Sequence, residues 1–298
     1  MGGHMFIHAI EVASQFTRPI HSIQGYYGSV EVIPGAASLF FVNADGWALT
    51  CKHVAALIVN GDKIAKRKSD FEADFASMRG KKKDKQILKD LEKKYALSRN
   101  ELFEIRNSFI NCIEGPLSFQ IVAHPDFDVA LIHFTNYTKL HPHSFPVFPR
   151  KTVGLKQGKF LCRLGFPFPE FSNFTYDQIT DSIQWANTGK DVTPIFPIEG
   201  MLTRHLLSQS GQVFGFEMST PGLRGQSGGP AFDFEGQVWG MQSATNHLDL
   251  DFDVDKAVLR NGQKKHVHDT AILHVGHCIH VDILKSFMTQ HSVQFQEV

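Results

Sequence analysis

The sequence contains little that would tie the protein to a membrane or to a nucleic acid. Its 298 residues carry 30 basic and 30 acidic side chains, so no basic surface is predicted and no nucleic-acid partner is expected. Apolar runs such as residues 36–42 and 272–281 are too short, or too interrupted by polar groups, to span a bilayer. No secretory signal peptide is evident. These absences indicate a globular protein, either cytoplasmic or exported without a cleaved signal peptide.

Cysteine is also scarce, and its spacing predicts neither disulfides nor a zinc site. The four cysteines are scattered along the chain: Cys51, Cys112, Cys162 and Cys278. We therefore expect reduced, mostly buried thiols in a reducing compartment.

Several histidines gather near the C-terminal end: His266, His268, His274, His277 and His280. Alternation along a strand would place His277 on the face opposite to His274 and His280, and no cysteine or carboxylate completes a ligand set. We expect no metal and no cofactor.

What the sequence does contain is a serine in a glycine-rich turn. Residues 223–230 read Leu-Arg-Gly-Gln-Ser-Gly-Gly-Pro. Serine is a weak nucleophile unless a base activates it and N–H donors stabilise the oxyanion that forms. Gly225 can turn the backbone so that its own N–H and that of Ser227 meet, which predicts an oxyanion hole over Gly225, Gln226 and Ser227. A structural turn before a strand has the same pattern, so partners are needed.

His53 is the candidate base. Two apolar runs, 37–42 and 47–50, flank an Asn-Ala-Asp-Gly turn and predict a β-hairpin. His53 follows the second run closely, and a histidine just past a buried strand is held rigidly while still facing a cleft.

Asp128 is the candidate acid. It directly precedes an apolar run at 129–132, where a carboxylate can be buried and can orient a histidine. Asp126 competes for this role, but it is better placed to cap the turn that begins at Pro125.

The rest of the chain divides into four parts. An N-terminal arm is predicted at residues 1–24, of which 1–4 look like a cloning remnant. A first β-barrel is predicted at 25–144, interrupted by a helical insert at 60–108. A second β-barrel is predicted at 145–281, and a closing helix and tail at 282–298. In the arm, residues 6–16 could form a short helix, and the first strand is predicted at 25–33. Short segments broken by Gly, Pro and Asn are typical of antiparallel barrels.

Five strands are predicted in the second half, at 160–165, 195–203, 213–218, 231–234 and 238–242. A loop is predicted at 245–269 and a last strand at 272–281. We expect Asp282 to cap the closing helix.

The insert is rich in Lys, Glu and Leu and spaced for two or three amphipathic helices. Ser69 with Glu72 and Ser98 with Glu101 match the capping box that begins a helix. Helical faces are predicted for three groups: Phe71, Phe75 and Met78; Leu88, Leu91 and Tyr95; Leu102, Ile105 and Phe109. A regulatory protein is a possible partner of this insert.

These motifs resemble those of a trypsin-like serine peptidase of the chymotrypsin fold, nearest to the HtrA/Deg-like bacterial branch but without a PDZ domain. The resemblance rests on Thr-Cys-Lys-His-Val at 50–54, Asp-Val-Ala-Leu at 128–131, Leu-Gly-Phe-Pro at 164–167 and Gly-Gln-Ser-Gly-Gly-Pro at 225–230. A terminal strand and helix around 278–288 complete it.

The resemblance implies an all-β core of two antiparallel six-stranded barrels, with His53, Asp128 and Ser227 as a catalytic triad at their interface. It also implies binding of a protein or peptide substrate. The implied substrate-binding residues form two segments: Thr220, Pro221 and Gly222, and Ser243, Ala244 and Thr245. Ser243 is also expected to reach Asp128.

Two positions depart from the pattern of secreted trypsin-like enzymes. Gln226 replaces the acid that binds a new N-terminus, and Pro221 replaces the aspartate of enzymes that cleave after basic residues. An apolar or small side chain is therefore the expected primary specificity. The hypotheses are an active endopeptidase, a catalytically silent peptide-binding module on the same fold, and a protease gated by a partner.

Overall fold

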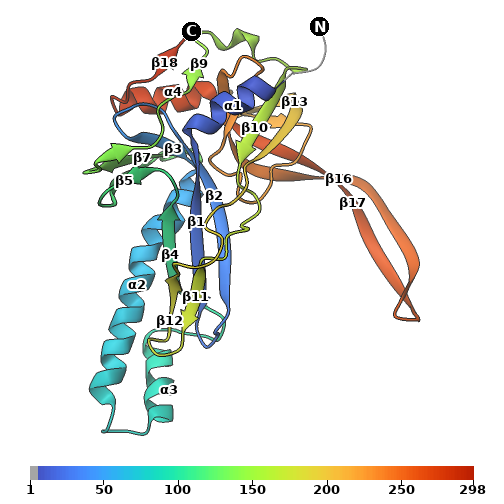
Figure 1. Cartoon of the computed structure of the whole chain (residues 1–298). Coiled ribbons are helices and arrows are strands. Elements are labelled where there is room, and N and C mark those ends of the chain that lie inside the picture. The colour runs from blue at the N-terminus through green and yellow to red at the C-terminus, as the bar shows by residue number, and fades with distance from the viewer. Residues whose placement is uncertain (1–5) are drawn as a thin grey trace.

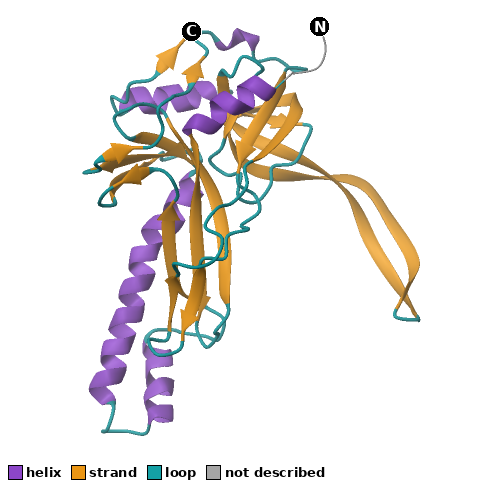
Figure 2. Cartoon of the chain, viewed as in Figure 1, coloured by secondary structure: helices purple, strands orange, loops and turns teal. Residues whose placement is uncertain are grey.

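The computed structural model describes residues 6–298, and it is built from two antiparallel β units (Figures 1 and 2). The stretch interpreted as a cloning remnant lies outside the described residues. None of the helices in the described part of the chain has the length and apolar character needed to cross a membrane.

The first unit is an open six-stranded sheet in the order β4-β1-β2-β3-β7-β6. Its strands are β1 (Thr17–Tyr26), β2 (Val32–Phe41), β3 (Trp47–Thr50), β4 (Leu102–Phe109), β6 (Ser118–Ala123) and β7 (Ala130–Thr135). The predicted hairpin forms β2 and β3. Residues 17–24, expected to belong to an arm, are part of β1 instead.

The second unit is a closed six-stranded barrel in the cyclic order β10-β13-β14-β17-β16-β15. Its strands are β10 (Phe160–Gly165), β13 (Phe196–Leu207), β14 (Val213–Met218), β15 (Pro230–Phe232), β16 (Val238–Arg260) and β17 (Gln263–His280). The mostly-β, chymotrypsin-like fold class is confirmed, with the first barrel present as a half-barrel.

Minor strand pairs and four helices complete the described part of the chain. The pairs are β5 (Ile113–Glu114) with β8 (Lys139–Leu140), β11 (Phe174–Asp177) with β12 (Ser182–Trp185), and β9 (Val147–Phe148) with β18 (Gln296–Glu297). The helices are α1 (Ile7–Phe16), α2 (Lys52–Met78), α3 (Asp84–Lys94) and α4 (Val281–Gln290), with a 3-10 turn at Thr152–Gly154.

A single apolar core joins the two units. Phe6, the N-cap residue of α1, packs against Phe232 of the second barrel with ring centroids 6.3 Å apart. At the other end of α1, Phe16 packs against Phe40 of the first sheet, also at 6.3 Å. Helix α4 contributes Phe287 to the same core. Because α1 and α4 touch both units, the cleft between the units has fixed walls.

The insert differs from its prediction at both ends. Helix α2 begins at Lys52 and passes through Gly61, where a Cβ would lie 3.4 Å from Ile105 of β4. Glycine lets the helix approach the strand closely at this point. Ser69 lies inside α2 and caps nothing, so that capping box was wrong.

Residues 102–109 form β4 and not the predicted helix. This strand pairs with β1 from Tyr26↔Leu102 to Ile20↔Phe109. Its apolar residues satisfy a period of two as well as a helical period, and pairing with β1 decides between them. Glu101 still accepts the Ser98 N–H at 3.2 Å, but no helix follows.

The predicted loop at 245–269 is a long two-stranded ribbon formed by β16 and β17, which projects away from the barrel in Figure 1. At the end of β17, the cap of α4 is His280, whose Nδ1 accepts the Asp282 N–H at 3.1 Å. Asp282 lies in the first turn and was wrongly predicted as the cap.

Candidate active site

His53 lies where β3 passes into α2. It occupies the first turn of the helix, where backbone N–H groups have no partner within the helix. The His53 N–H donates to Asp128 Oδ1 at 3.0 Å. The backbone of this residue therefore binds the same carboxylate as its ring.

Asp128 lies two residues before β7 and is the centre of a hydrogen-bond network. Its Oδ2 lies 2.8 Å from His53 Nδ1 and accepts the Ser243 hydroxyl at 2.5 Å. Burial opposes its ionisation, but the hydrogen bonds from His53 and Ser243 outweigh that effect and lower the pKa of Asp128 to about 2. An ionised carboxylate at this distance favours the His53 tautomer that carries its proton on Nδ1.

Asp126 occupies a different environment. Its backbone N–H donates to His124 Nδ1 at 3.1 Å. Within residues 6–298, no hydrogen bond or ion pair joins Asp126 to His53. It is therefore Asp128 that the structure brings to His53.

Two consecutive type II turns hold Ser227. The Gln226 N–H donates to Leu223 O, and the Gly229 N–H donates to Gln226 O, both at 2.9 Å. A type II turn requires a positive φ at its third residue, and the third residues are Gly225 (φ +103°) and Gly228 (φ +88°). The backbone itself therefore requires glycine at these two positions.

These turns leave two N–H groups unused beside the serine. Neither the Gly225 N–H nor the Ser227 N–H donates a hydrogen bond within the described chain. The Gly225 carbonyl is held by the Ser38 hydroxyl at 2.8 Å, and the Ser38 N–H donates to Ser227 O at 2.9 Å. The first sheet thus fixes the orientation of the turn, and the two free N–H groups match what an oxyanion requires.

Ser227 lies in the same groove as His53, a cavity of about 510 Å³ lined by both β units. Its hydroxyl donates to the carbonyl oxygen of Ser243 at 3.1 Å. In the described residues no hydrogen bond joins it to His53. The structure therefore brings His53 and Ser227 to one groove, with Asp128 bonded to His53 and no hydrogen bond between His53 and Ser227.

Comparison with known proteins decides the family. Residues 37–241 match the family of trypsin-like peptidase domains. The chain belongs to this family. The protein is accordingly a serine protease, and a hydrolase of peptide bonds.

Solved structures that resemble this peptidase include other proteases. One is the active form of the Rv3671c protease from M. tuberculosis, with 11% identity and a TM-score of 0.46, covering 97% of this chain and 86% of that one. Another is the HtrA-type protease AlgW with a decapeptide, with 12% identity and a TM-score of 0.47, covering 95% of this chain and 66% of that one. No curated protein sequence matches the chain.

In this peptidase, the side chain of Gln226 braces the turn. This side chain is fully buried, its Oε1 accepts the Leu223 N–H at 3.0 Å, and its Nε2 donates to Phe196 O at 3.1 Å. Contacts within the chain thus occupy the position where secreted relatives carry an acid.

The two segments predicted to bind substrate line a second cavity, of about 450 Å³, which Ser227 also lines. Five of the six predicted residues line it: Pro221, Gly222, Ser243, Ala244 and Thr245. Thr220 lies behind the wall, where its hydroxyl donates to Glu199 O at 2.7 Å. The Thr245 hydroxyl spans the cavity to Gly222 O at 2.5 Å. This cavity is called the primary pocket below.

Three possible metal ligands meet beside the groove. Ligand atoms of Cys51, His53 and Asp128 lie within 4.8 Å of one another. Burial raises the pKa of Cys51 well above its usual value, and the thiol donates to Gln242 O at 3.2 Å. A neutral thiol is a poor metal ligand. Among residues 6–298 no other such group was found, so the C-terminal histidines do not gather into one.

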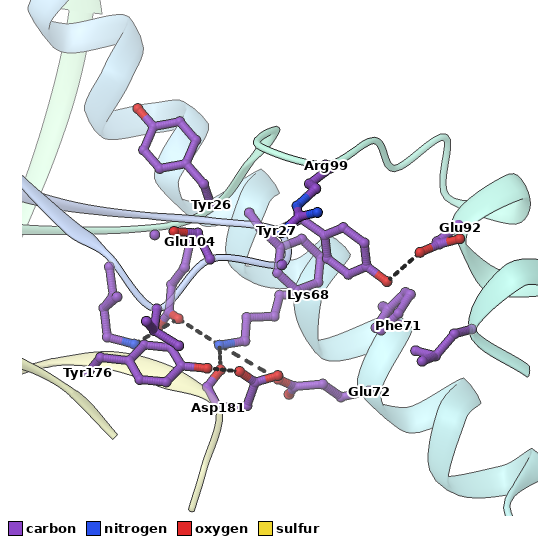
Figure 3. A pocket seen from close by; sticks show the side chains of 17 residues that line it. Tyr26, Tyr27, Lys68, Phe71, Glu72, Glu92, Arg99, Glu104, Tyr176 and Asp181 are labelled. Atoms are coloured by element: carbon purple, nitrogen blue, oxygen red, sulfur yellow. Dashed lines mark hydrogen bonds and ion pairs between the residues drawn. The ribbon is translucent and has the colours of Figure 1, made fainter. Parts of the chain in front are cut away.

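The helical insert carries a separate cavity of about 470 Å³ (Figure 3). Lys68 of α2 lies inside it, paired with Glu104 of β4 at 2.6 Å and bonded to Asp181 O at 2.8 Å. Tyr27 donates to Glu92 at 3.1 Å on the opposite side. Residues of α2, α3, β4 and the β11–β12 turn therefore meet at one polar and aromatic site.

Motif matching missed two residues that support the site, Ser38 and Arg163. Neither lies in a recognised motif, and both act through partners far away in the chain. Ser38 belongs to the apolar run that forms β2, and Arg163 directly precedes the Leu-Gly-Phe-Pro segment. The unusual feature of Arg163 was visible in the sequence: it is a charged residue within a predicted buried strand.

Proposed function

We propose that the protein is a serine endopeptidase in which Ser227 is the nucleophile, His53 the general base and Asp128 the residue that orients His53. The observation that carries this proposal is the His53–Asp128 contact in the groove that also contains Ser227 and two unused N–H groups. A silent binding module would need none of these features together.

In the proposed reaction, Ser227 Oγ attacks the carbonyl carbon of a peptide bond while His53 Nε2 takes the hydroxyl proton. The Gly225 and Ser227 N–H groups donate to the oxyanion. His53 then gives its proton to the leaving amine, which leaves an acyl ester on Ser227. Water, deprotonated by His53, hydrolyses the ester and restores the hydroxyl. Asp128 stays ionised throughout and stabilises the imidazolium.

The open Ser227–His53 link fits a site that substrate completes. The Ser243 carbonyl now accepts the Ser227 hydroxyl. A substrate that adds as a strand along Ser243, Ala244 and Thr245 would bring a backbone N–H to the same carbonyl. We propose that this N–H displaces the hydroxyl, which then rotates toward His53. Hydrogen bonds of this kind often tighten only in the complex.

The test of this function is hydrolysis of an unfolded protein substrate by matched variants. The wild type should cleave it, and Ser227→Ala and His53→Ala should each lose at least roughly 1000-fold in rate. Ser210→Ala, at an exposed turn, should cleave like the wild type. Comparable activity in Ser227→Ala would remove the nucleophile from the proposal.

We also propose that the insert regulates this site, because one continuous helix links them. Helix α2 carries His53 in its first turn, and further along it carries Lys68 and Phe71, which line the cavity of the helical insert. A partner that binds this cavity and shifts α2 would change how His53 faces Ser227. The same link explains how the enzyme could be gated by a partner.

The insert cannot be tested by removing residues 63–107, because that deletion would take away most of β4 from the first sheet. Point substitution is cleaner. Lys68→Met breaks the buried pair with Glu104, and we expect kcat/KM to change by roughly fivefold or more. Lys89→Met, exposed on α3, is the control and should have no effect. If both variants match the wild type, the regulatory role is wrong.

The proposed location is a reducing compartment. The four cysteines are unpaired and buried, which supports that proposal. Fractionation of expressing cells, with antibody detection in each fraction, tests it.

A further inference from the structure

Arg163 of β10 is a fully buried cation without an acidic partner. Its side chain has no solvent exposure, and its guanidinium donates to neutral acceptors: Gln242 Oε1 at 2.7 Å, Thr220 Oγ1 at 2.6 Å, Thr220 O at 3.0 Å and Pro221 O at 3.1 Å. Within residues 6–298 no carboxylate is paired with it, and its Nε has no acceptor. A buried charge left without a counter-charge is costly, so its retention calls for a functional explanation.

The guanidinium lies directly behind the primary pocket. Its contacts to Thr220 and Pro221 belong to one wall, and its contact to Gln242 belongs to the other. Opposite it, a Cβ on Gly276 would lie 1.9 Å from Arg163 Nη1. The lack of a side chain at Gly276 therefore makes the space that the cation fills.

Arg163 also sets the orientation of Gln242. Because Nη1 donates to Oε1, the amide of Gln242 must point its Nε2 the other way. One Nε2 hydrogen is donated to Ala244 O at 2.7 Å, and the other has no acceptor in the described chain. Nε2 lies so close to Gly222 that a Cβ added to Gly222 would be only 2.1 Å away from it. Gln242 thus presents an unused N–H at the wall of the pocket.

The remaining lining of the pocket is basic or neutral. Arg224, His247 and His274 line it, and no aspartate or glutamate does so among the described residues. The two histidines share a contact of 2.5 Å between their Nδ1 atoms. The pocket therefore has an N–H donor on its wall, the Arg163 cation behind it and the Arg224 cation in its lining.

We propose that the primary pocket selects an acidic substrate side chain, glutamate or aspartate, at the residue whose carbonyl is attacked. Gln242 and the Thr245 hydroxyl would donate to the carboxylate, the hydroxyl turning from Gly222 O to do so. Arg163 would supply the counter-charge through Gln242. This inference rests on the proposed function, and it replaces the apolar or small preference expected from Pro221 alone.

The first test compares peptides that differ only in the residue before the scissile bond: Glu, Asp, Gln, Ala, Phe or Lys. We expect kcat/KM for Glu or Asp to exceed that for Gln by roughly tenfold or more, because the pocket recognises the negative charge of the side chain as well as its shape. Equal rates for Glu and Gln, or preference for Ala, Phe or Lys, would overturn the proposal.

The second test changes the buried charge. Arg163→Met removes the cation, and Gln242→Glu places a carboxylate next to the cation and so neutralises its charge. Each variant should reduce the ratio of kcat/KM for the Glu peptide to kcat/KM for the Gln peptide by roughly tenfold. Arg18→Met is the control, because Arg18 also donates to three backbone carbonyls but lies outside the pocket. Its ratio should match the wild type. If Arg163→Met fails to fold, Gln242→Glu decides; an undiminished ratio there contradicts the role of Arg163.

The acidic preference of the pocket and the protease activity itself can be refuted separately. A fluorophosphonate that labels Ser227, together with cleavage that ignores acidic residues, overturns the acidic pocket and leaves the protease in place. Absence of both labelling and cleavage overturns the proposed function and the pocket with it.

Discussion

The Ser38 hydroxyl is the contact that most directly joins the first sheet to the oxyanion turn. It donates to the Gly225 carbonyl at 2.8 Å, and Ser38 is fully buried. Ser38→Ala leaves that carbonyl buried without its donor, which costs about 1–3 kcal/mol. This carbonyl belongs to the 225–226 peptide, whose N–H closes the first turn on Leu223 O at 2.9 Å, so any shift that relieves the cost loosens the turn that presents the Gly225 N–H.

The expected loss follows from that energy. If about 1–3 kcal/mol of turn stability is lost, kcat should fall roughly 5- to 150-fold, because each 1.4 kcal/mol is a factor of ten. This range approaches the loss produced when an oxyanion donor is removed outright. KM should change less than kcat, since the interaction matters most in the transition state.

The assay is steady-state hydrolysis of a peptide substrate, with urea unfolding measured in parallel. Thr17→Val is the matched control: it removes a buried hydroxyl that donates to Ala13 O at 2.7 Å, away from the groove. It should lose stability without losing kcat. The reasoning is refuted if Ser38→Ala keeps its kcat, or if Thr17→Val loses as much.

Three further predictions concern strain, acid stability and the support of the carboxylate. Gly228→Ala should lower the free energy of unfolding by more than about 2 kcal/mol, because the new Cβ would lie 2.1 Å from a backbone carbonyl oxygen. Gly211→Ala is the control, since Gly211 has a similar φ and open space around it; it should cost about 1 kcal/mol. Urea unfolding measures both. Burial lowers the pKa of His21 from 6.5 to about 4, so as the pH falls the unfolded chain takes up a proton on His21 before the folded chain does. The free energy of unfolding should therefore fall by about 3 kcal/mol between pH 6.5 and pH 4, and by less in His21→Gln. Ser243→Ala removes a donor to Asp128, and kcat/KM should drop roughly tenfold; an unchanged value would show that His53 alone supports the carboxylate.

The strands that surround the site follow from sequence pattern. The segments 160–165 and 213–218 form β10 and β14 with the predicted bounds, since each is a short, largely apolar run flanked by turn-forming Gly, Ser or Pro. The hairpin before His53 forms for the same reason. These local signals place His53 just after a strand, Asp128 just before one and Ser227 in a turn.

Other elements depend on contacts that sequence pattern does not contain. Asn60 and Gly61 are typical of a turn, yet α2 continues through them because Gly61 packs closely on β4. The ribbon of β16 and β17, in contrast, does carry a strand signal that the loop prediction overlooked: apolar residues alternate with aspartate from Leu248 to Asp255, and Asn261-Gly262 is typical of a hairpin turn. Its strands pair over a long register.

The fine geometry of the site was also beyond the motifs. The motif around Ser227 does not tell which acceptor its hydroxyl uses, because the competing carbonyl belongs to Ser243, 16 residues away. The role of Arg163 likewise depends on Gln242, 79 residues away. The first depends on the pairing of β15 with β16, and the second on the closure of the barrel, which places β10 and β16 on either side of β15.

The central claim is that Ser227 is activated by His53, and one measurement tests it most directly. The protein is treated with a fluorophosphonate, and the modified residue is located by mass spectrometry of the digested chain. We predict one adduct, on Ser227, and none in His53→Ala or Ser227→Ala. An adduct on another residue, or equal labelling of Ser227 when His53 is replaced, would contradict the account.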